Sequence, residues 1–249
     1  MLGVSPSSVA SIAQALNAAQ VPCVLWGHCL LNIHGVPSIV SSIDFVVPDD
    51  RLQVSIETLS KVRTLPACLR GELCPSGPQP YSPAPAFHIH MDGSKVTVDL
   101  YLQSETLWFL PSFDGTLSSP RKAKVPFDLV IASDQTILPP RRPGRGSGVF
   151  PSTEYPVLVP RAHVLLEAFM RLYVRDAETR TGSFAMAMIT YMEEYVDEDG
   201  LLDVDRLPEP LGSFYKELGK GKKPVRQWTE ELKGALRRED DRGGFEKDQ

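Results

Sequence analysis

Alternating apolar and polar positions divide this chain of 249 residues into a first half with short strands and a second half with amphipathic helices. Near the N-terminus, Ser7 and Ser8 precede apolar positions at helical spacing, which predicts a helix behind a serine cap. The apolar run at 21–26 and the sequence IDFVV at 43–47 predict two strands. Between them the pattern predicts a short helix that ends before Gly35.

Residues 87–91 and 95–102 have the pattern of a β-hairpin. They are joined by Asp92-Gly93-Ser94, a sequence that is typical of a tight turn. In the second strand apolar residues alternate with a set that includes Asp99, so the strand has two chemically different faces.

The second half of the chain begins after a stretch rich in proline and arginine at 137–156, which predicts a long loop or a domain junction. Residues 157–238 have helical periodicity, and the all-polar sequence at 239–249 predicts a disordered tail. The expected organisation is therefore an α+β domain at 1–136, a linker, a helical domain and a tail.

Composition and charge narrow the class of protein. A hydrophobic content of 42% and a charged content of 23% are typical of globular proteins and argue against wholesale disorder. No apolar run is long enough for a transmembrane helix, so we expect no membrane partner. The net charge of −5 argues against a general nucleic-acid coat protein, although it allows a local basic patch. Four cysteines without C-x-x-C spacing, and no signal-peptide pattern, predict a reduced, cytoplasmic chain.

The strongest chemical signal lies at 21–50. Its order is a strand, a glycine turn at Gly27, a short helix, the pair His34-Gly35, and a strand that carries Asp44. A buried aspartate is costly unless it is paired or bound to metal. Mg²⁺ prefers carboxylate oxygens, so this strand is a candidate metal-binding element.

These residues carry a resemblance to a known family. Seven positions fall in register with its motif: Gly27, His34, Gly35, Pro37, Ile43, Asp44 and Val47. The region 21–47 thereby resembles the nucleotidyltransferase superfamily, which has the polymerase-beta-like fold and includes kanamycin nucleotidyltransferase and the AbiEii-type toxins. The resemblance implies an α+β fold, with a nucleotidyltransferase-like mixed β-sheet, flanking helices and a C-terminal helical domain.

The resemblance also implies roles for individual residues. It assigns Asp44 and Asp99 as catalytic residues that hold Mg²⁺, and Gly27, His28 and Ser42 as nucleotide-binding residues. The sequence departs from the family pattern at two of these positions. Ser42 stands where the family has the first aspartate of a pair at i and i+2, and His28 replaces the second glycine of the turn.

Three alternative functions are consistent with this resemblance. The first is an enzyme that transfers a nucleotidyl group from an NTP to an unidentified acceptor with Mg²⁺. The second is a nucleotidyltransferase scaffold repurposed to use tRNA or aminoacyl-tRNA, as in the fungal arginine-containing cyclodipeptide synthases. The third is a non-catalytic nucleotide-binding or antitoxin-like protein. RNA contacts in the second alternative are expected from two basic patches: Arg141, Arg142, Arg145, Lys220, Lys222 and Lys223.

His88 and His90 form an H-x-H pair on one face of the first hairpin strand. Such a pair can bind a metal ion, but no third ligand is evident at a suitable spacing. The sequence therefore predicts two exposed hairpin histidines.

Overall fold

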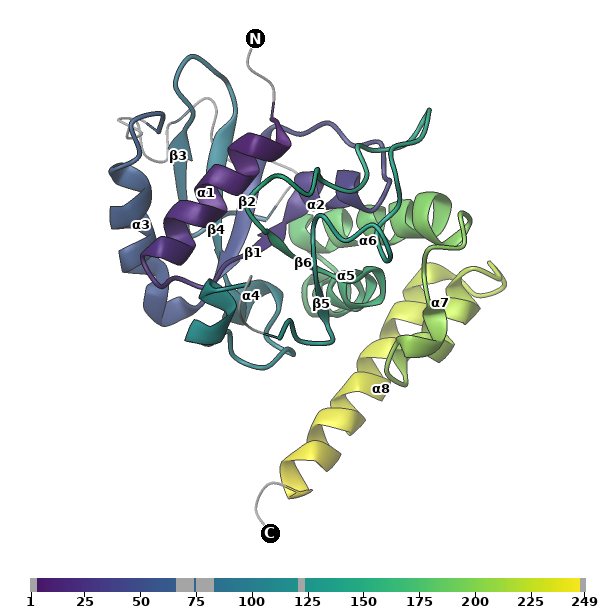
Figure 1. The fold of residues 1–249 in the computed structure, drawn as a ribbon. Coiled ribbons are helices and arrows are strands. Elements are labelled where there is room, and N and C mark those ends of the chain that lie inside the picture. Colours follow the sequence, from purple (N-terminus) through teal and green to yellow (C-terminus); the bar gives the residue numbers. More distant parts are fainter. Residues whose placement is uncertain (1–3, 66–73, 75–82, 121–123, 247–249) are drawn as a thin grey trace. The chain divides into compact units, whose positions relative to one another are not determined.

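The computed structural model describes residues 4–65, 74, 83–120 and 124–246, with side chains described as far as residue 238. The chain forms two compact units that divide between Arg161 and Ala162. The predicted α+β class is confirmed, because a mixed sheet with flanking helices is followed by C-terminal helices (Figure 1).

The first unit is built around one sheet, whose described strands have the order β3-β4-β2-β1-β6-β5. Strands β2 and β4 are parallel, as are β1 and β6, and the other neighbouring pairs are antiparallel. The predicted hairpin is confirmed by the antiparallel pairing of β3 with β4. The strand bounds are β1 Val24–Trp26, β2 Ser42–Val47, β3 Phe87–His90, β4 Thr97–Leu102, β5 Leu129–Ile131 and β6 Leu158–Pro160.

The two faces of this sheet differ in chemistry, because successive residues of a strand point to opposite sides. One face carries apolar side chains that are fully buried: Leu25, Ile43, Phe45, Ile89, Val98 and Leu100. The opposite face carries the polar residues of β2, β3 and β4. Burial of the apolar face supplies the main hydrophobic stabilisation of the sheet. Because side chains alternate along each strand, this burial directs the intervening polar residues to the opposite face.

Helices α1 and α3 contact each other and lie against the sheet (Figure 1). The N-cap of α1 is Ser5, whose side chain accepts a hydrogen bond from the backbone N–H of Ser8. This start is earlier than the serine pair suggested, because Pro6 fits the first helical position. The helix bounds in this unit are α1 Pro6–Ala18, α2 Gly27–Ile33, α3 Leu52–Ser60 and α4 Gln103–Thr106.

The loop predicted at 137–156 is part of the first unit and packs beside α2. The backbone N–H of Gly146 donates to the Gly35 carbonyl at 2.8 Å, and that of Gly148 donates to the Asn32 carbonyl at 3.0 Å. Strand β6 then returns to the sheet, so the boundary between the units comes after β6. Loop hydrogen bonds to the backbone around the end of α2 thus hold a proline-rich segment without regular secondary structure.

The second unit consists of helices around a core that contains Trp228. The indole N–H of Trp228 donates to the Phe214 carbonyl at 2.9 Å, and the hydroxyls of Tyr173 and Thr229 are 2.8 Å apart. Because every one of these groups is paired, the aromatic core is buried without a polar penalty. The helix bounds are α5 Ala162–Asp176, α6 Arg180–Met192, α7 Leu211–Leu218 and α8 Val225–Glu246.

Helix α8 continues to Glu246, across most of the segment that the sequence predicted as a disordered tail. Residues 247–249 of that prediction lie outside the described residues. Among the helices that the structure describes, none combines the length and apolar character needed to cross a membrane.

The contact between the loop and α2 generates a stability prediction. A Cβ at Gly146 would overlap the backbone of Asn32 and Val36, so Gly146→Ala should lower the free energy of unfolding by ~1–3 kcal/mol. Gly115→Ala is the matched control, because a Cβ there meets nothing within 4 Å. Urea unfolding of both variants measures the difference, and equal stabilities would contradict the described packing of the loop.

Candidate functional site

Two aspartates lie side by side at the centre of the polar face of the sheet. Asp44 of β2 and Asp99 of β4 are direct partners in the parallel ladder, and each residue is only 4% exposed. One oxygen of each carboxylate, Oδ1, is buried and has no hydrogen-bond partner among the described residues. The structure therefore brings together the two carboxylates that the resemblance assigned to one site.

Electrostatics in this site oppose ionisation of both carboxyls. Burial raises the pKa of Asp44, and the neighbouring charge of Asp99 raises it further, while a hydrogen bond from Ser42 acts in the opposite direction. Burial likewise raises the pKa of Asp99, against the effects of Thr97 and His90. A cation between the two carboxylates would remove this conflict, because an opposite charge favours the ionised form.

The hydroxyl groups of the same face complete the surroundings of the pair. Ser42 and Thr97 are also partners in the ladder, two positions before the aspartates, so they lie on the same face. Tyr101 lies two positions after Asp99, and its pKa is raised by burial and by the charges of both aspartates. Its hydroxyl donates to the Pro83 carbonyl at 3.2 Å.

Gly27 lies directly against the Asp44 carboxylate. Its φ of +65° is a conformation that residues with a side chain rarely adopt, and a Cβ there would overlap Asp44 Oδ2. The glycine in the predicted turn is thus required for two reasons, the backbone angle and the space for the carboxylate. This contact places the turn between β1 and α2 at the carboxylate pair.

His28 is the next residue in the turn, and its side chain is directed to the loop after α2. Its Nδ1 lies 2.5 Å from the Ser38 hydroxyl, and burial lowers its pKa, which favours the neutral ring. Asn32 ties the same loop down through hydrogen bonds from its side-chain amide to the carbonyls of His28 and Ser38. A neutral His28 held in this way positions the loop rather than offering a positive charge to a phosphate.

The donor set of the pair fits Mg²⁺. Two carboxylates side by side, each with an oxygen that lacks a partner among the described residues, supply the hard oxygen ligands that this ion prefers. Ser42 provides a hydroxyl where the family pattern has the first aspartate of the pair at i and i+2. Asp44 and Asp99 are the residues that would hold the ion, and Ser42 hydrogen-bonds to the first of them.

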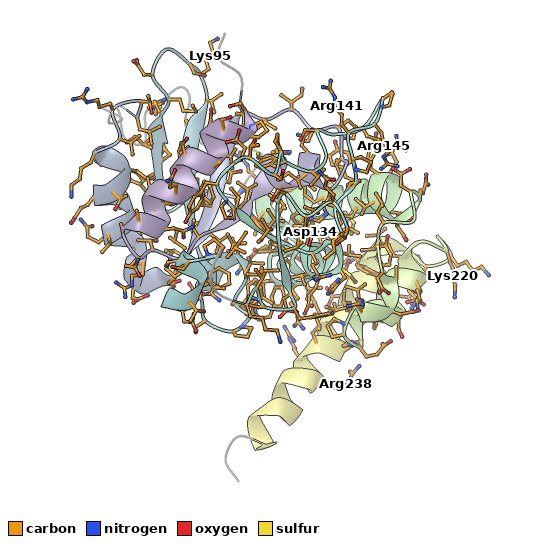
Figure 2. All side chains as sticks on the ribbon, in the orientation of Figure 1. Lys95, Asp134, Arg141, Arg145, Lys220 and Arg238 are labelled. Carbon is orange, nitrogen blue, oxygen red and sulfur yellow. The ribbon has the colours of Figure 1, made fainter. Side chains whose placement is uncertain are left out.

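The basic residues predicted for RNA contact occur in both units. Arg141 and Arg145 lie on the loop that packs beside α2 (Figure 2), and Arg141 is exposed. Arg142 lies beside Gly35. In the second unit Lys220 and Lys222 belong to the segment between α7 and α8, and Lys220 is exposed. Lys223 instead forms ion pairs with Glu217 and Glu231.

The sequence pattern did not predict two further groups of polar side chains that lie close together in the structure. Cys74 Sγ lies 3.1 Å from His90 Nε2. The two residues are separated by a proline-rich sequence with no periodic pattern, so the sequence did not predict this contact. In the second unit His163, Glu167 and Arg171 recur at helical spacing along α5, and the Glu167 carboxylate accepts a hydrogen bond from Arg171 at 2.8 Å. The i, i+4 spacing of these three residues in a predicted helix would have predicted that their side chains lie close together.

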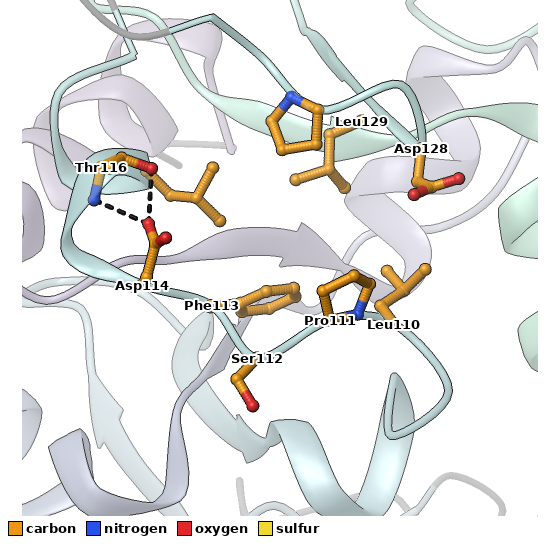
Figure 3. Close-up of a pocket in the computed structure, with 10 residues that line it drawn as sticks. Leu110, Pro111, Ser112, Phe113, Asp114, Thr116, Asp128 and Leu129 are labelled. Atoms are coloured by element: carbon orange, nitrogen blue, oxygen red, sulfur yellow. Dashed lines mark hydrogen bonds between the residues drawn. The ribbon is translucent and has the colours of Figure 1, made fainter. Parts of the chain in front are cut away.

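A separate pocket of about 140 Å³ lies in the first unit, away from the residues predicted for the site (Figure 3). Its walls are mainly apolar, with Leu110, Pro111, Phe113 and Leu129 among them. The Asp114 carboxylate at this pocket accepts hydrogen bonds from the backbone and hydroxyl of Thr116, which lower its pKa. None of the predicted site residues lines this pocket, so it is separate from the carboxylate pair.

Comparisons with protein-family models, with curated proteins and with solved structures found no match. The resemblance of 21–47 to the nucleotidyltransferase superfamily therefore stays a prediction from the sequence. A function for this chain has to be inferred from the geometry and electrostatics of the carboxylate pair.

The raised pKa values generate a prediction about stability and pH. Both folded-state values lie above the ordinary 3.8, so the folded chain binds protons more tightly than the unfolded chain. The free energy of unfolding should therefore fall as the pH rises from about 5 to about 8 in the presence of a chelator. Asp44→Asn removes one charge at nearly constant size, so it should stabilise the metal-free chain at about pH 8, by on the order of 1–2 kcal/mol.

Urea unfolding at the two pH values measures this effect as a difference between variant and wild type. Asp50→Asn is the control, because the side chain of Asp50 is 79% exposed and its removal should leave the pH dependence unchanged. A wild-type pH dependence that Asp44→Asn leaves unaltered would show that the pair is not under electrostatic strain.

Proposed function

We propose that this chain is a Mg²⁺-dependent transferase that moves a nucleotidyl group from an NTP to an acceptor. One observation carries the proposal: Asp44 and Asp99 are in register on neighbouring parallel strands, and each has a buried oxygen without a partner among the described residues. The resemblance of 21–47 to the nucleotidyltransferase superfamily points to the same chemistry.

In this proposal the chain's own residues bind and orient. Asp44 and Asp99 hold the ion, which when bound supplies positive charge to phosphate oxygens as negative charge develops at the leaving group. Ser42 lies on the same face two positions before Asp44, and its hydroxyl lowers the pKa of that carboxyl. Gly27 allows the turn before α2 to lie against that carboxylate, and in this proposal Gly27 and His28 of the turn are the nucleotide-binding residues.

The substitution of Ser42 for an aspartate favours a single ion over a pair of ions. Two carboxylates from the protein carry two negative charges, and the remaining ligands of an octahedral ion are then water and phosphate oxygens. A site of this kind depends on the nucleotide for part of its coordination sphere. We therefore expect Mg²⁺ and NTP to bind together more tightly than either binds alone.

A calorimetric titration of each NTP in the presence of Mg²⁺ tests the proposal. Wild type should bind at least one NTP in the micromolar range. Asp44→Asn and Asp99→Asn should weaken this binding more than about 30-fold, because each removes a ligand of the ion. Asp50→Asn, an exposed carboxylate, should leave the affinity unchanged.

Two outcomes would contradict the proposed transferase. One is NTP binding that is equally strong with a chelator in place of Mg²⁺. The other is unaltered Mg²⁺-dependent binding in both Asp44→Asn and Asp99→Asn, with the fold of each variant verified by urea unfolding.

A second candidate function, a repurposed scaffold that uses tRNA or aminoacyl-tRNA, is favoured by the arginine-rich loop. Hydrogen bonds to the Asn32 and Gly35 carbonyls hold this loop in the same unit as the carboxylate pair, and Arg141 on it is exposed. Arginines that contact a phosphate backbone give binding that is sensitive to salt. In this function the pair would act as a base or bind a cationic amine, without metal.

Fluorescence anisotropy with bulk tRNA tests the second candidate. The charge reversal Arg141→Glu should weaken binding about 10-fold at low salt, because it replaces a phosphate contact with a repulsive charge. Asp50→Asn serves again as a surface control. Absence of tRNA binding by wild type at low salt would exclude this function.

A further inference from the structure

We propose that Cys74, His88 and His90 form a zinc-binding site that is distinct from the carboxylate pair. One ligand atom from each of these residues can be chosen so that all three atoms lie within 4.8 Å of one another. Cys74 Sγ and His90 Nε2 are 3.1 Å apart. Cys74 is the third ligand that the spacing of the H-x-H pair did not reveal.

The two histidines are brought together by the strand itself. They occupy positions i and i+2 of β3, so both point to the same face, and their ring centroids are 5.7 Å apart at an interplanar angle of 83°. Two imidazoles on one strand face can direct ring nitrogens toward a common point. Strand β3 is the edge strand of the described sheet.

A second observation points to a missing ligand. The Nε2 atom of His88 is buried and has no hydrogen-bond partner among the described residues. A buried polar atom without a partner costs free energy, so native structures pair it with protein, with water or with an ion. A metal ion held by the thiolate of Cys74 and the ring of His90 would supply that partner.

The chemistry of the three donors selects the ion. One thiolate and two imidazoles are the ligands that Zn²⁺ prefers, whereas Mg²⁺ prefers oxygen. Ligand atoms around a tetrahedral Zn²⁺ are about 3.3–3.8 Å apart, so the described cluster needs only small side-chain movements to close on the ion. Three protein ligands leave a fourth position for solvent, and all three residues are partly exposed.

Asp99 connects this site to the carboxylate pair. It is the direct partner of His88 in the β3–β4 ladder, so the two side chains lie on the same face of the sheet. A carboxylate behind a metal-bound histidine commonly orients the ring. Asp99 thus lies between Asp44 on β2 and His88 on β3.

The other described cysteines are poor competitors for the ion. Cys23 and Cys29 are buried, and burial raises the pKa of each thiol to about 12, so neither readily forms the thiolate that binds metal. Cys68 lies outside the described residues. Cys23→Ser is therefore a matched control for the removal of Cys74.

Cobalt substitution and zinc competition test the site. Added Co²⁺ should give a thiolate-to-cobalt charge-transfer band and the visible bands of tetrahedral coordination, and the charge-transfer band should saturate at about one ion per chain. Titration against a chromophoric chelator should show that Cys74→Ser, His88→Asn and His90→Asn each weaken Zn²⁺ binding by at least about 100-fold. Cys23→Ser should keep both the band and the affinity.

A charge-transfer band that persists in Cys74→Ser, or Zn²⁺ binding that is absent in wild type, would overturn the proposal. Alkylation gives a second readout that does not depend on the stability of a variant. Zn²⁺ should protect the Cys74 peptide of the wild-type chain from iodoacetamide, and unchanged labelling would also overturn the site.

The zinc site and the proposed transferase can fail separately. Asp44→Asn should lose Mg²⁺-dependent NTP binding and keep the cobalt band, because Asp44 is not a ligand of the Cys/His cluster. Cys74→Ser should lose the cobalt band and keep Mg²⁺-dependent NTP binding. Loss of both signals in either variant would contradict the assignment of two distinct sites.

Discussion

Two carboxylates buried side by side impose the main constraint on the first unit, because burial and mutual repulsion both disfavour their ionised forms. The local structure is arranged around this constraint. Gly27 leaves room for one carboxylate, and hydroxyls of Ser42 and Thr97 stabilise the ionised forms in part. The apolar opposite face of the same strands holds the pair in place through hydrophobic burial.

The polar face of the sheet combines donors of different chemical character. Oxygen donors occupy the central strands β2 and β4, while nitrogen and sulfur donors gather at the edge strand β3. Hard ions prefer the oxygen donors and borderline-soft ions prefer the nitrogen and sulfur donors, so the two proposed sites on this face should differ in selectivity. Asp99 belongs to the first site and is linked to the second through its pairing with His88.

Hydrogen bonds to α2 and to the residues that follow it hold two loops of the first unit. The proline-rich segment at 137–156 donates to carbonyls around the end of α2, where glycine is the residue that allows so close an approach. The loop after α2 is held by Asn32 and by the contact of His28 with Ser38. Both loops therefore depend on α2, the helix that begins at the carboxylate pair.

Local periodicity determined much of this protein from sequence alone: the α+β class, the β3–β4 hairpin, the strand that carries Asp44 and the alternation that sets Asp99 on one face of β4. Each of these depends on contacts between residues that are close in the chain. The parallel register that makes Asp44 and Asp99 neighbours, the packing of the 137–156 loop within the first unit and the approach of Cys74 to His90 were decided only by the tertiary structure. These three features depend on contacts between segments that are far apart in the sequence. The packing of the whole unit selects those contacts, and the local periodicity of strands and helices carries no information about them.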